Sequence, residues 1–258
     1  MLPLSGKRIL VTREATKAHT ITRLIEQQGG ISIEIPLLHF QGIYSDENEK
    51  IMKQLPSYDW VFFTSTNGIH FFFELMKHYN NTYEQAAKLK FAVIGEKTEE
   101  VLNDFGYEAH FIPNTYTGEH LGKEFNEFTS KCCSILVVQG NLAKQSVVQE
   151  LSTRDHVIST AEMYETRVNV RMKEALKKSL QGTRLDIITF TSPSTVQAFV
   201  KLAEEEWREE LMSIPCVCIG PSTQAEAIKK GFNYTMIPEY YTVEGMIEVA
   251  SAYFNKKG

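Results

Sequence analysis

The chain has few cysteines and no long hydrophobic run, and these absences exclude whole classes of protein. Its 258 residues include only four cysteines, and neither Cys132–Cys133 nor Cys216–Cys218 has the spacing of a zinc or redox site. No apolar run approaches the roughly 18 residues of a membrane span. The start, MLPLSGKRILVT, lacks the apolar core and cleavage site of a signal peptide. We therefore expect a reduced, cytoplasmic protein that does not bind a membrane.

The chain also lacks an excess of basic residues. It carries 27 Lys and Arg against 32 Asp and Glu, a formal net charge of −5. A nucleic-acid partner normally requires a basic patch, so we expect none. A chain that is acidic overall can still hold a local cationic pocket, so an anionic small molecule remains a compatible ligand.

The familiar catalytic and cofactor motifs are missing as well. There is no GxGxxG after a strand, no P-loop, no GxSxG and no HExxH. The seven histidines show no metal-ligand spacing. The sequence therefore contains no recognised cofactor fingerprint and no metal-ligand pattern.

The sequence does contain a repeat. The stretch LDIITFTSPSTVQAF from Leu185, with CVCIG after it, is similar to YDWVFFTSTNGIHFF from Tyr58, with FAVIG after it. The offsets agree at 192 − 65 = 127 for the serines and 220 − 95 = 125 for the glycines. Solenoid repeats are only about 20–50 residues long. Two copies at this longer period therefore predict two similar domains.

Strand and helix patterns alternate throughout the chain, which predicts an α/β fold. Strands such as WVFFT and DIITFT are apolar on both faces, which is typical of a parallel sheet covered by helices on both sides. Each copy has segments for about five strands. The middle block supplies WVFF, FAVI, HFI, ILVV and VIST, and the two ends of the chain supply ILVT, ISIEI, DIITF, CVCI and YTMI.

This distribution predicts that one domain is inserted into the other. The outer domain would comprise residues 1–36 and 168–258, and the inserted domain residues 40–163. Two hinge strands, 37–39 and 164–167, would cross between them. They lie at matching repeat positions, since 164 − 38 = 126, and we expect them to run side by side.

Small polar residues follow most of the predicted strands. Ligands of open parallel sheets bind beyond the carboxyl ends of the strands, and a helix that starts there offers unpaired N–H groups to anions. Ser and Thr are also ordinary helix N-caps, so capping alone explains any single junction. Six such junctions together favour a cradle for a polyanion. The candidate binding residues are Arg13, Thr64, Ser65, Asn67, Gly95, Thr98, Gly140, Asn141, Lys144, Ser192, Ser194, Gly220, Ser222, Thr223 and Thr242.

Tyr164 is the candidate catalytic residue. It lies in MYETR on the second crossing segment, where its phenol could donate a proton to a bound ligand. Packing of the hinge is an equally good explanation of a tyrosine at this position.

The motifs and their order resemble those of the uroporphyrinogen-III synthase family over essentially the whole chain. The parts that carry the resemblance are ILVTR from Ile9, FTSTNG from Phe63, AVIGEKT from Ala92, QGN from Gln139, MYET from Met163, FTSPST from Phe190, IGPST from Ile219 and IPEYYTVEGM from Ile237. Each motif is short, and their order and spacing together are specific.

The resemblance implies two flavodoxin-like domains joined by a two-stranded ladder, in a cytoplasmic lyase of tetrapyrrole and haem biosynthesis. The implied substrate is hydroxymethylbilane, a linear tetrapyrrole with eight carboxylates. The implied product is uroporphyrinogen III, formed with inversion of ring D and loss of water. The resemblance also implies that no cofactor and no metal are needed. By the same resemblance Tyr164 would assist departure of the substrate hydroxyl, and the polar junctions would hold the carboxylates. We expect a monomer, and transient contact with hydroxymethylbilane synthase stays open.

Two departures from the family pattern concern individual contacts. Glu14 follows Arg13 where the family commonly has proline, and Lys144 stands where arginine is frequent, which keeps the charge without bidentate geometry. Two other classes of protein fit the same architecture, namely a non-catalytic two-domain binder and a nucleotide-sugar transferase. Binding of an acidic tetrapyrrole without turnover would favour the first, and protection by a nucleotide sugar the second.

Overall fold

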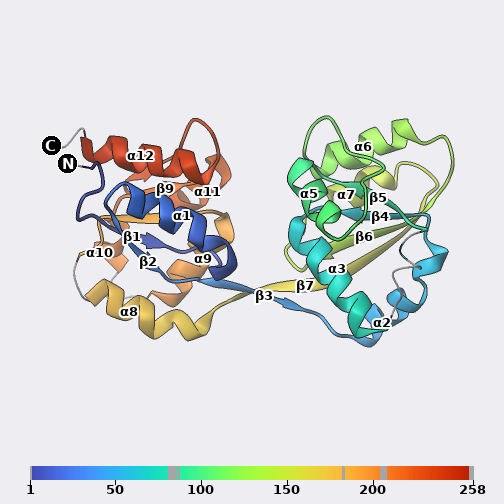
Figure 1. Cartoon of the computed structure of the whole chain (residues 1–258), viewed down its shortest axis with the longest axis horizontal. Coiled ribbons are helices and arrows are strands. Elements are labelled where there is room, and N and C mark those ends of the chain that lie inside the picture. Colours follow the sequence, from blue (N-terminus) through green and yellow to red (C-terminus); the bar gives the residue numbers. More distant parts are fainter. Residues whose placement is uncertain (1, 81–85, 87, 182–183, 204–207, 256–258) are drawn as a thin grey trace. The chain divides into compact units, whose positions relative to one another are not determined.

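The computed structural model describes residues 2–80, 86, 88–181, 184–203 and 208–255. Contacts divide the chain into two compact units. The first unit comprises Met1–His39 and Arg167–Gly258, and the second comprises Phe40–Thr166. Each has one five-stranded sheet with helices on both faces (Figure 1).

The first unit contains a sheet with the strand order β10-β9-β8-β1-β2. All four of its strand pairs are parallel. All five segments expected at the two ends of the chain form strands here. Their bounds are β1 Arg8–Val11, β2 Ile31–Glu34, β8 Ile187–Phe190, β9 Cys216–Cys218 and β10 Thr235–Met236.

The strands of this sheet are apolar on both faces because both faces are covered. Ile9 and Val11 of β1 belong to a cluster with Ile21 of α1 and Met246 of α12. Leu10, between them, belongs to a cluster on the other face. That second cluster includes residues of α8, α9, α10 and α11. The helix bounds are α1 Ala15–Gln27, η2 Val170–Met172, α8 Lys173–Gln181, α9 Pro193–Leu202, α10 Arg208–Met212, α11 Pro221–Lys229 and α12 Val243–Asn255.

The second unit has the strand order β3-β7-β6-β4-β5. Its strands are β3 Leu38–Gly42, β4 Trp60–Phe63, β5 Lys90–Val93, β6 Ser134–Gly140 and β7 Val157–Val168. The expected HFI strand is absent from this described sheet, and only an isolated bridge joins Phe111 to Ala92. Pro113 follows within two residues and cannot donate to a ladder. The fifth strand is β3 instead.

Strands β3 and β7 lie at the boundary between the two units. The Ile43 N–H donates to Met163 O at 2.9 Å and the Asn169 N–H donates to Leu37 O at 2.8 Å, so the two segments run antiparallel. Pro36 separates β2 from β3, because proline cannot take part as a donor in the ladder.

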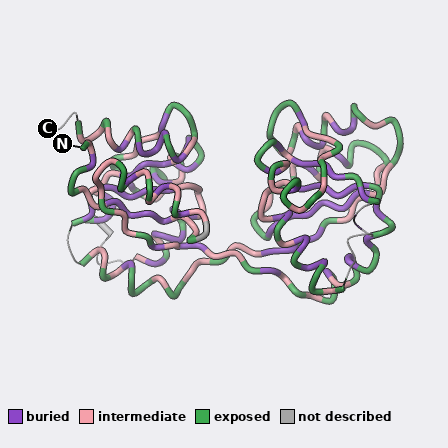
Figure 2. The backbone as a smooth tube through the Cα atoms, in the orientation of Figure 1, coloured by how far each residue is buried: buried purple, intermediate pink, exposed green. Residues whose placement is uncertain are grey.

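Helices also cover both faces of the second sheet. Val61 and Phe63 pack in the cluster that contains α3, whereas Trp60 and Phe62 pack against α6 and α7. The strands therefore form the buried centre of each unit, and exposed residues lie mainly on helices and loops (Figure 2). The helix bounds are α2 Asp46–Lys53, η1 Leu55–Ser57, α3 Thr66–His78, α5 Glu96–Asp104, α6 Gly118–Phe128 and α7 Ser146–Leu151.

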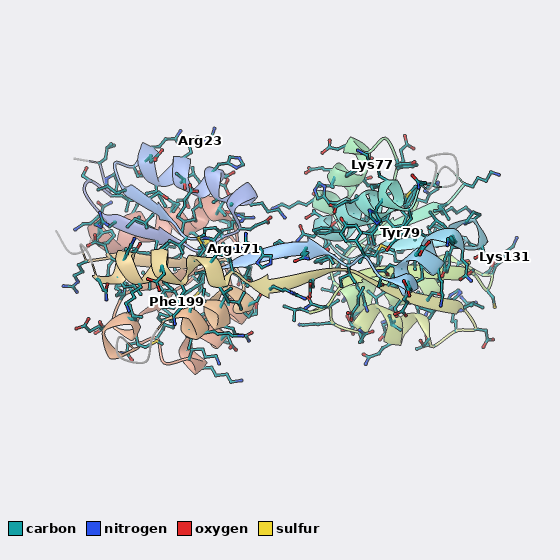
Figure 3. All side chains as sticks on the ribbon, turned by 90° about the horizontal axis from the view of Figure 1, so that it is seen from below. Arg23, Lys77, Tyr79, Lys131, Arg171 and Phe199 are labelled. Carbon is teal, nitrogen blue, oxygen red and sulfur yellow. The ribbon has the colours of Figure 1, made fainter. Side chains whose placement is uncertain are left out.

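The two sheets share one strand order once the repeat is taken into account. At an offset of about 126, β6, β7, β4 and β5 correspond to β1, β2, β8 and β9, and the Phe111 bridge takes the position of β10. The aromatic core at Phe199, labelled in Figure 3, illustrates the packing of the first unit. Its ring centroid lies 5.6 Å from that of Phe190 and 5.9 Å from that of Phe232.

Candidate active site

A hollow of about 290 Å³ lies at the carboxyl edge of the second sheet. Five of the predicted site residues line it: Thr64, Ser65, Gly140, Lys144 and Tyr164. They come from the ends of β4 and β6, from the loop after β6, and from β7. The parallel strands of this sheet thus bring together residues about 100 positions apart in the chain.

A register shift in β7 aims the Tyr164 side chain. Gln139 pairs with Glu162, but the next residue, Gly140, pairs with Tyr164, which leaves Met163 as the extra residue of a bulge. Met163 packs in the core on the α3 side of the sheet. Regular alternation along the strand would point the next side chain, that of Tyr164, to the face of the sheet away from α3. The bulge instead lets Tyr164 also approach α3, as bulges near functional sites often do.

Two aromatic rings and the backbone of a glycine pack against the Tyr164 ring. Phe71 of α3 stacks on it with 5.3 Å between the ring centroids, and Phe40 contacts it edge-on at 6.1 Å. On the third side lies the backbone of Gly140, where a Cβ atom would meet the ring carbon Cζ at 2.5 Å. The ring is therefore fixed, and its hydroxyl group is at the hollow.

The Tyr164 hydroxyl shares a hydrogen bond with Ser65. The Ser65 Oγ lies 3.0 Å from the phenol oxygen, and either atom could be the donor. The same Oγ accepts the Gly68 N–H as the N-cap of α3. Burial raises the pKa of Tyr164 above its ordinary value of 10.0, and the Ser65 hydrogen bond lowers it by less. The phenol is consequently protonated at neutral pH and can act as a hydrogen-bond or proton donor.

The remaining predicted residues of the second unit lie at the same edge but do not line this hollow. Gly95 is the N-cap of α5, and Thr98 is buried in the first turn of that helix. The Asn141 side chain accepts the Thr166 N–H at 2.8 Å, so it secures the loop to β7. Asn67 lies in the first turn of α3.

The carboxyl edge of the first sheet repeats this arrangement. Ser192 caps α9 in a capping box with Thr195, and its Oγ lies 3.1 Å from that of Ser194. Gly220 is the N-cap of α11, with Ser222 exposed and Thr223 buried in the first turn. The Thr242 Oγ accepts the Gly245 N–H in the first turn of α12. These helix starts present N–H groups at one edge of the sheet.

Two cationic side chains lie at the start of α1 on this edge. Arg13 ends the loop after β1, and Lys17 lies in the first turn of the helix. Burial lowers the pKa of Arg13, and Glu14 and Glu244 partly offset this by raising it. Burial also lowers the pKa of Lys17. A guanidinium stays charged at neutral pH even so, and it provides the positive charge that a carboxylate ligand requires.

The two edges differ in one respect that the repeat makes visible. Subtracting the offset of 126 from Tyr164 gives Leu38, which has no hydroxyl group. Ser65 does have a counterpart, Ser192, at an offset of 127. A buried phenol at the position of Tyr164 is thus present at the edge of only one of the two described sheets.

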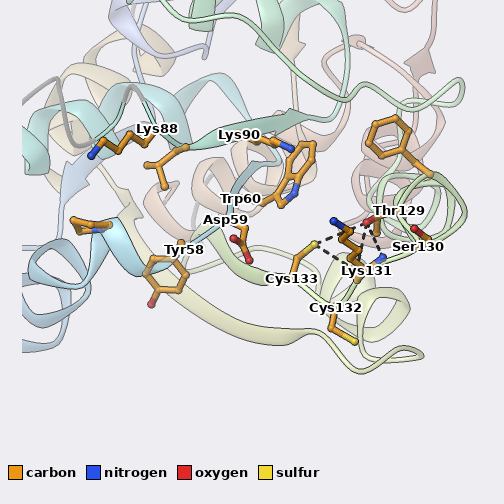
Figure 4. A pocket seen from close by; sticks show the side chains of 13 residues that line it. Tyr58, Asp59, Trp60, Lys88, Lys90, Thr129, Ser130, Lys131, Cys132 and Cys133 are labelled. Atoms are coloured by element: carbon orange, nitrogen blue, oxygen red, sulfur yellow. Dashed lines mark hydrogen bonds between the residues drawn. The ribbon is translucent and has the colours of Figure 1, made fainter.

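A larger hollow, of about 590 Å³, lies at the opposite edge of the second sheet (Figure 4). It is lined by Trp60 and Lys90 at the starts of β4 and β5 and by the segment just before β6, and none of the predicted site residues is among the described residues that line it. The first unit has a hollow of about 620 Å³ at its own amino edge. Because both amino edges are hollowed alike, we attribute the shape to the fold and place the site at the carboxyl edge.

Some residues at the carboxyl edges were not predicted as site residues. Phe71 of α3 stacks on Tyr164. Tyr116 and Tyr241 are exposed tyrosines that lie against Gly95 and Gly220. Their common repeat offset, 241 − 116 = 125, was the signal that could have found them.

The described residues offer no group of three or more His, Cys, Asp or Glu side chains that could hold a metal ion. Within the same residues, none of the helices is both long and apolar enough to span a membrane.

These features define a class of protein: a two-unit α/β protein whose sheets present polar groups and helix N-termini at their carboxyl edges, with one buried phenol donor. The model of a family described as uroporphyrinogen-III synthase HemD matches residues 19–248. The chain belongs to the uroporphyrinogen-III synthase family, whose enzymes act in tetrapyrrole biosynthesis.

Individual relatives agree with this assignment. The chain is 29% identical over 249 residues to a porphyrin biosynthesis protein HemD of Ruminiclostridium josui, covering 95% of this chain and 48% of the relative. It is 31% identical over 245 residues to a protein of Methanocaldococcus jannaschii named for the same synthase, covering 94% and 97%. The chain thus spans about half the length of the first of these relatives and nearly all of the second.

Solved structures show the same fold. A uroporphyrinogen III synthase mutant of Thermus thermophilus superimposes with a TM-score of 0.66 at 15% identity, covering 98% of this chain and all of the other. The synthetase of Helicobacter pylori superimposes with a TM-score of 0.65 at 16% identity, covering 96% and 99%.

Proposed function

We propose that this chain converts hydroxymethylbilane into uroporphyrinogen III, with inversion of ring D and loss of water. The observation that carries the proposal is the position of the Tyr164 phenol, a protonated donor in a hollow at the carboxyl edge. Ligand pockets usually measure about 300–1,000 Å³. At about 290 Å³ the hollow suits one substituted pyrrole ring of the substrate rather than all four.

The first chemical step requires a proton at the leaving oxygen. As the C–O bond of the hydroxymethyl group breaks, the pyrrole nitrogen supplies the electron pair that stabilises the cation left behind. Tyr164 donates a proton to the departing oxygen, which leaves as water. Ser65, 3.0 Å from the phenol, orients the hydroxyl. Inversion requires the cation to bond first to the ring D carbon that already carries the bridge to ring C. The C–C bond between that carbon and the bridge then breaks, and the bridge bonds to the other α-carbon of ring D. Loss of the proton from that α-carbon restores the aromatic ring and balances the proton given to the leaving water.

The protein's larger task is to hold the flexible substrate in the conformation that closes with ring D inverted. The substrate's carboxylates would bind the N–H groups at the helix starts and the cations Arg13, Lys17 and Lys144. The reaction as proposed requires no redox step.

We also propose that the units are flavodoxin-like domains. In this assignment residues 40–163 are inserted between residues 1–36 and 168–258, with 37–39 and 164–167 as hinge strands. Counted along the first unit, its strand order is 2-1-3-4-5, the order of flavodoxin-like sheets. We further propose that the protein acts in the cytoplasm as a monomer and receives its substrate by transient contact with hydroxymethylbilane synthase.

An isomer assay tests the proposed reaction. Freshly generated hydroxymethylbilane is supplied to the protein, the products are oxidised, and uroporphyrins I and III are separated by chromatography. Spontaneous closure gives isomer I, so we expect isomer III to appear in proportion to added protein. Isomer I alone, from protein shown to be folded by circular dichroism, would contradict the proposal.

Single hydroxyl groups at the helix starts should matter more for stability than for activity. Ser192→Ala removes the N-cap of α9, which typically costs about 1 kcal/mol. The backbone N–H groups remain, so we expect activity within about threefold of wild type, since neutral hydrogen bonds contribute only about 1 kcal/mol each. Urea unfolding and the isomer assay measure the two effects.

The matched control for Ser192→Ala is Ser179→Ala. Ser179 only donates to Ala175 O within α8, so both quantities should stay near wild type. Loss of activity in Ser192→Ala would show that side-chain hydroxyls rather than backbone groups hold the carboxylates.

A further inference from the structure

Two exposed tyrosines occupy equivalent positions at the carboxyl edges of the two sheets. Tyr116 is 51% exposed and Tyr241 is 58% exposed. Isolated exposed aromatic residues are common on proteins and need no explanation. Here the same residue recurs at an offset of 125, in the same local structure and at the edge where we place the substrate.

The local backbone is the same in both units. The Thr117 N–H donates to Thr115 O at 2.8 Å, and the Thr242 N–H donates to Tyr240 O at 2.7 Å. Each tyrosine is thus the central residue of a γ-turn. The next residue, Thr117 or Thr242, accepts a backbone N–H in the first turn of α6 or α12. The turn fixes the backbone position from which each tyrosine ring projects.

A buried glycine lies beneath each ring. A Cβ atom on Gly95 would meet Tyr116 at 2.8 Å, and one on Gly220 would meet Tyr241 at 3.5 Å. Both glycines have an extended backbone, with φ of 170° and −172°, which any residue can adopt. At Gly95 the missing side chain therefore serves the close approach of the ring rather than the backbone conformation.

Each ring lies between two helix starts. It rests on the N-cap of α5 or α11, and it immediately precedes the N-cap of α6 or α12. The Tyr116 hydroxyl donates to the Glu96 carboxylate at 2.8 Å, which fixes that ring at its far end. An exposed flat surface between two groups of N–H donors matches the chemistry of a pyrrole ring that carries two carboxylate side chains.

We infer that Tyr116 and Tyr241 are substrate-binding residues, each stacking on one dicarboxylate pyrrole ring. This inference rests on the proposed function for the identity of the ligand. Stacking on an aromatic side chain contributes the same order of energy whatever the ring's substituents. The two tyrosines would therefore place pyrrole rings, while the N–H groups beside them bind the carboxylates.

Four kinds of variant test the inference, in the isomer assay and in titrations with uroporphyrin III. In Tyr116→Ala and Tyr241→Ala we expect KM for hydroxymethylbilane and Kd for uroporphyrin III to rise roughly fivefold to tenfold, with kcat within twofold. Phenylalanine at either position should keep wild-type values because the ring remains. Leucine should behave like alanine, since it covers the glycine without offering an aromatic face. Tyr234→Ala, which changes a 61% exposed tyrosine next to β10, is the matched control and should change nothing.

The outcomes separate this inference from the proposed function. Titrations with uroporphyrin III measure binding without turnover. If the wild-type protein makes only isomer I but binds uroporphyrin III, and the alanine variants bind it more weakly, the proposed reaction is contradicted and the inference is supported. Wild-type production of isomer III with unchanged KM and Kd in both alanine variants would overturn the inference alone. Wild-type KM and Kd in the leucine variants would also overturn the inference, because they would show that the tyrosines only cover the glycines and do not stack on the ligand.

Discussion

Tyr164→Phe is expected to lower kcat about 100-fold while leaving KM and the fold nearly unchanged. General acid catalysis typically contributes about 10²- to 10⁴-fold. We expect the lower end because hydroxymethylbilane also loses its hydroxyl without any protein. The variant keeps the ring, so the contacts with Phe40 and Phe71 remain. Only the hydroxyl and its hydrogen bond to Ser65 are lost.

The measurement is steady-state formation of isomer III, with Tyr79→Phe as the matched control. Tyr79, labelled in Figure 3, also belongs to the second unit, and its hydroxyl donates to Ser45 O at 3.1 Å without lining the hollow. That variant should keep full activity. Wild-type kinetics in Tyr164→Phe would remove the phenol from the mechanism.

The same phenol sets an expectation for pH dependence. The donor form exists below the pKa of Tyr164 and disappears as the pH rises through it. Burial raises that pKa above 10.0, so Tyr164 should cause no fall in kcat from neutral pH up to that value. A pH–rate profile of wild type checks this, with isomer III as the readout. An alkaline decline centred well below pH 10 that vanished in Tyr164→Phe would show that the phenol is more acidic than its burial implies.

Gly140→Ala is expected to damage catalysis as severely as loss of the phenol itself. The new Cβ would lie 2.5 Å from Cζ and 3.0 Å from the hydroxyl oxygen of Tyr164. No real Cβ contact is that short, so the ring must move. Phe71 and Phe40 pack against the ring, and overpacking of this kind costs about 1–3 kcal/mol. Turnover should fall about 100-fold, because the donor leaves hydrogen-bonding distance of the reacting oxygen.

Gly42→Ala is the matched control for Gly140→Ala. It changes a glycine of β3 that is not a predicted site residue, where the new Cβ would meet the ring of the exposed Tyr44 at 3.2 Å, so a small shift of that ring relieves the contact. We expect it to keep most of the activity. The double variant Gly140→Ala/Tyr164→Ala provides a second check, because it removes the clash and should recover stability without recovering turnover. Full activity in Gly140→Ala would mean that the position of the Tyr164 ring does not limit the reaction.

Periodicity and the repeat predicted the first sheet well. Five apolar segments at the ends of the chain became β1, β2, β8, β9 and β10. The central strands β1, β8 and β9 are buried on both faces, which leaves a continuous hydrophobic run that is easy to recognise. The prediction of a strand at the HFI segment was wrong. The segment is short, it ends at a proline, and only Phe111 forms a bridge. A strand pattern in the sequence does not reveal how many ladder bonds the partner strand will accept.

The position of site residues along the chain was predictable, but their orientation was not. Strand ends followed by Ser, Thr and Gly were visible in the sequence, and five of the residues chosen there line one hollow. The aim of Tyr164 depends on a bulge opposite Gly140, and a bulge leaves no clear pattern in a single sequence. Phe71 lies in an aromatic run with the fully buried Phe72, and nothing in the sequence distinguishes the residue that contacts Tyr164 from the one in the core.

The difference between Tyr164 and its counterpart Leu38 makes the two units of the duplicated protein chemically unequal. In the proposed reaction the substrate carries its hydroxymethyl group at one end only. Because the Tyr164 phenol belongs to the second unit, a tetrapyrrole bound with its other end at this phenol has no leaving group there and cannot react. The phenol therefore distinguishes the head of the proposed substrate from its tail.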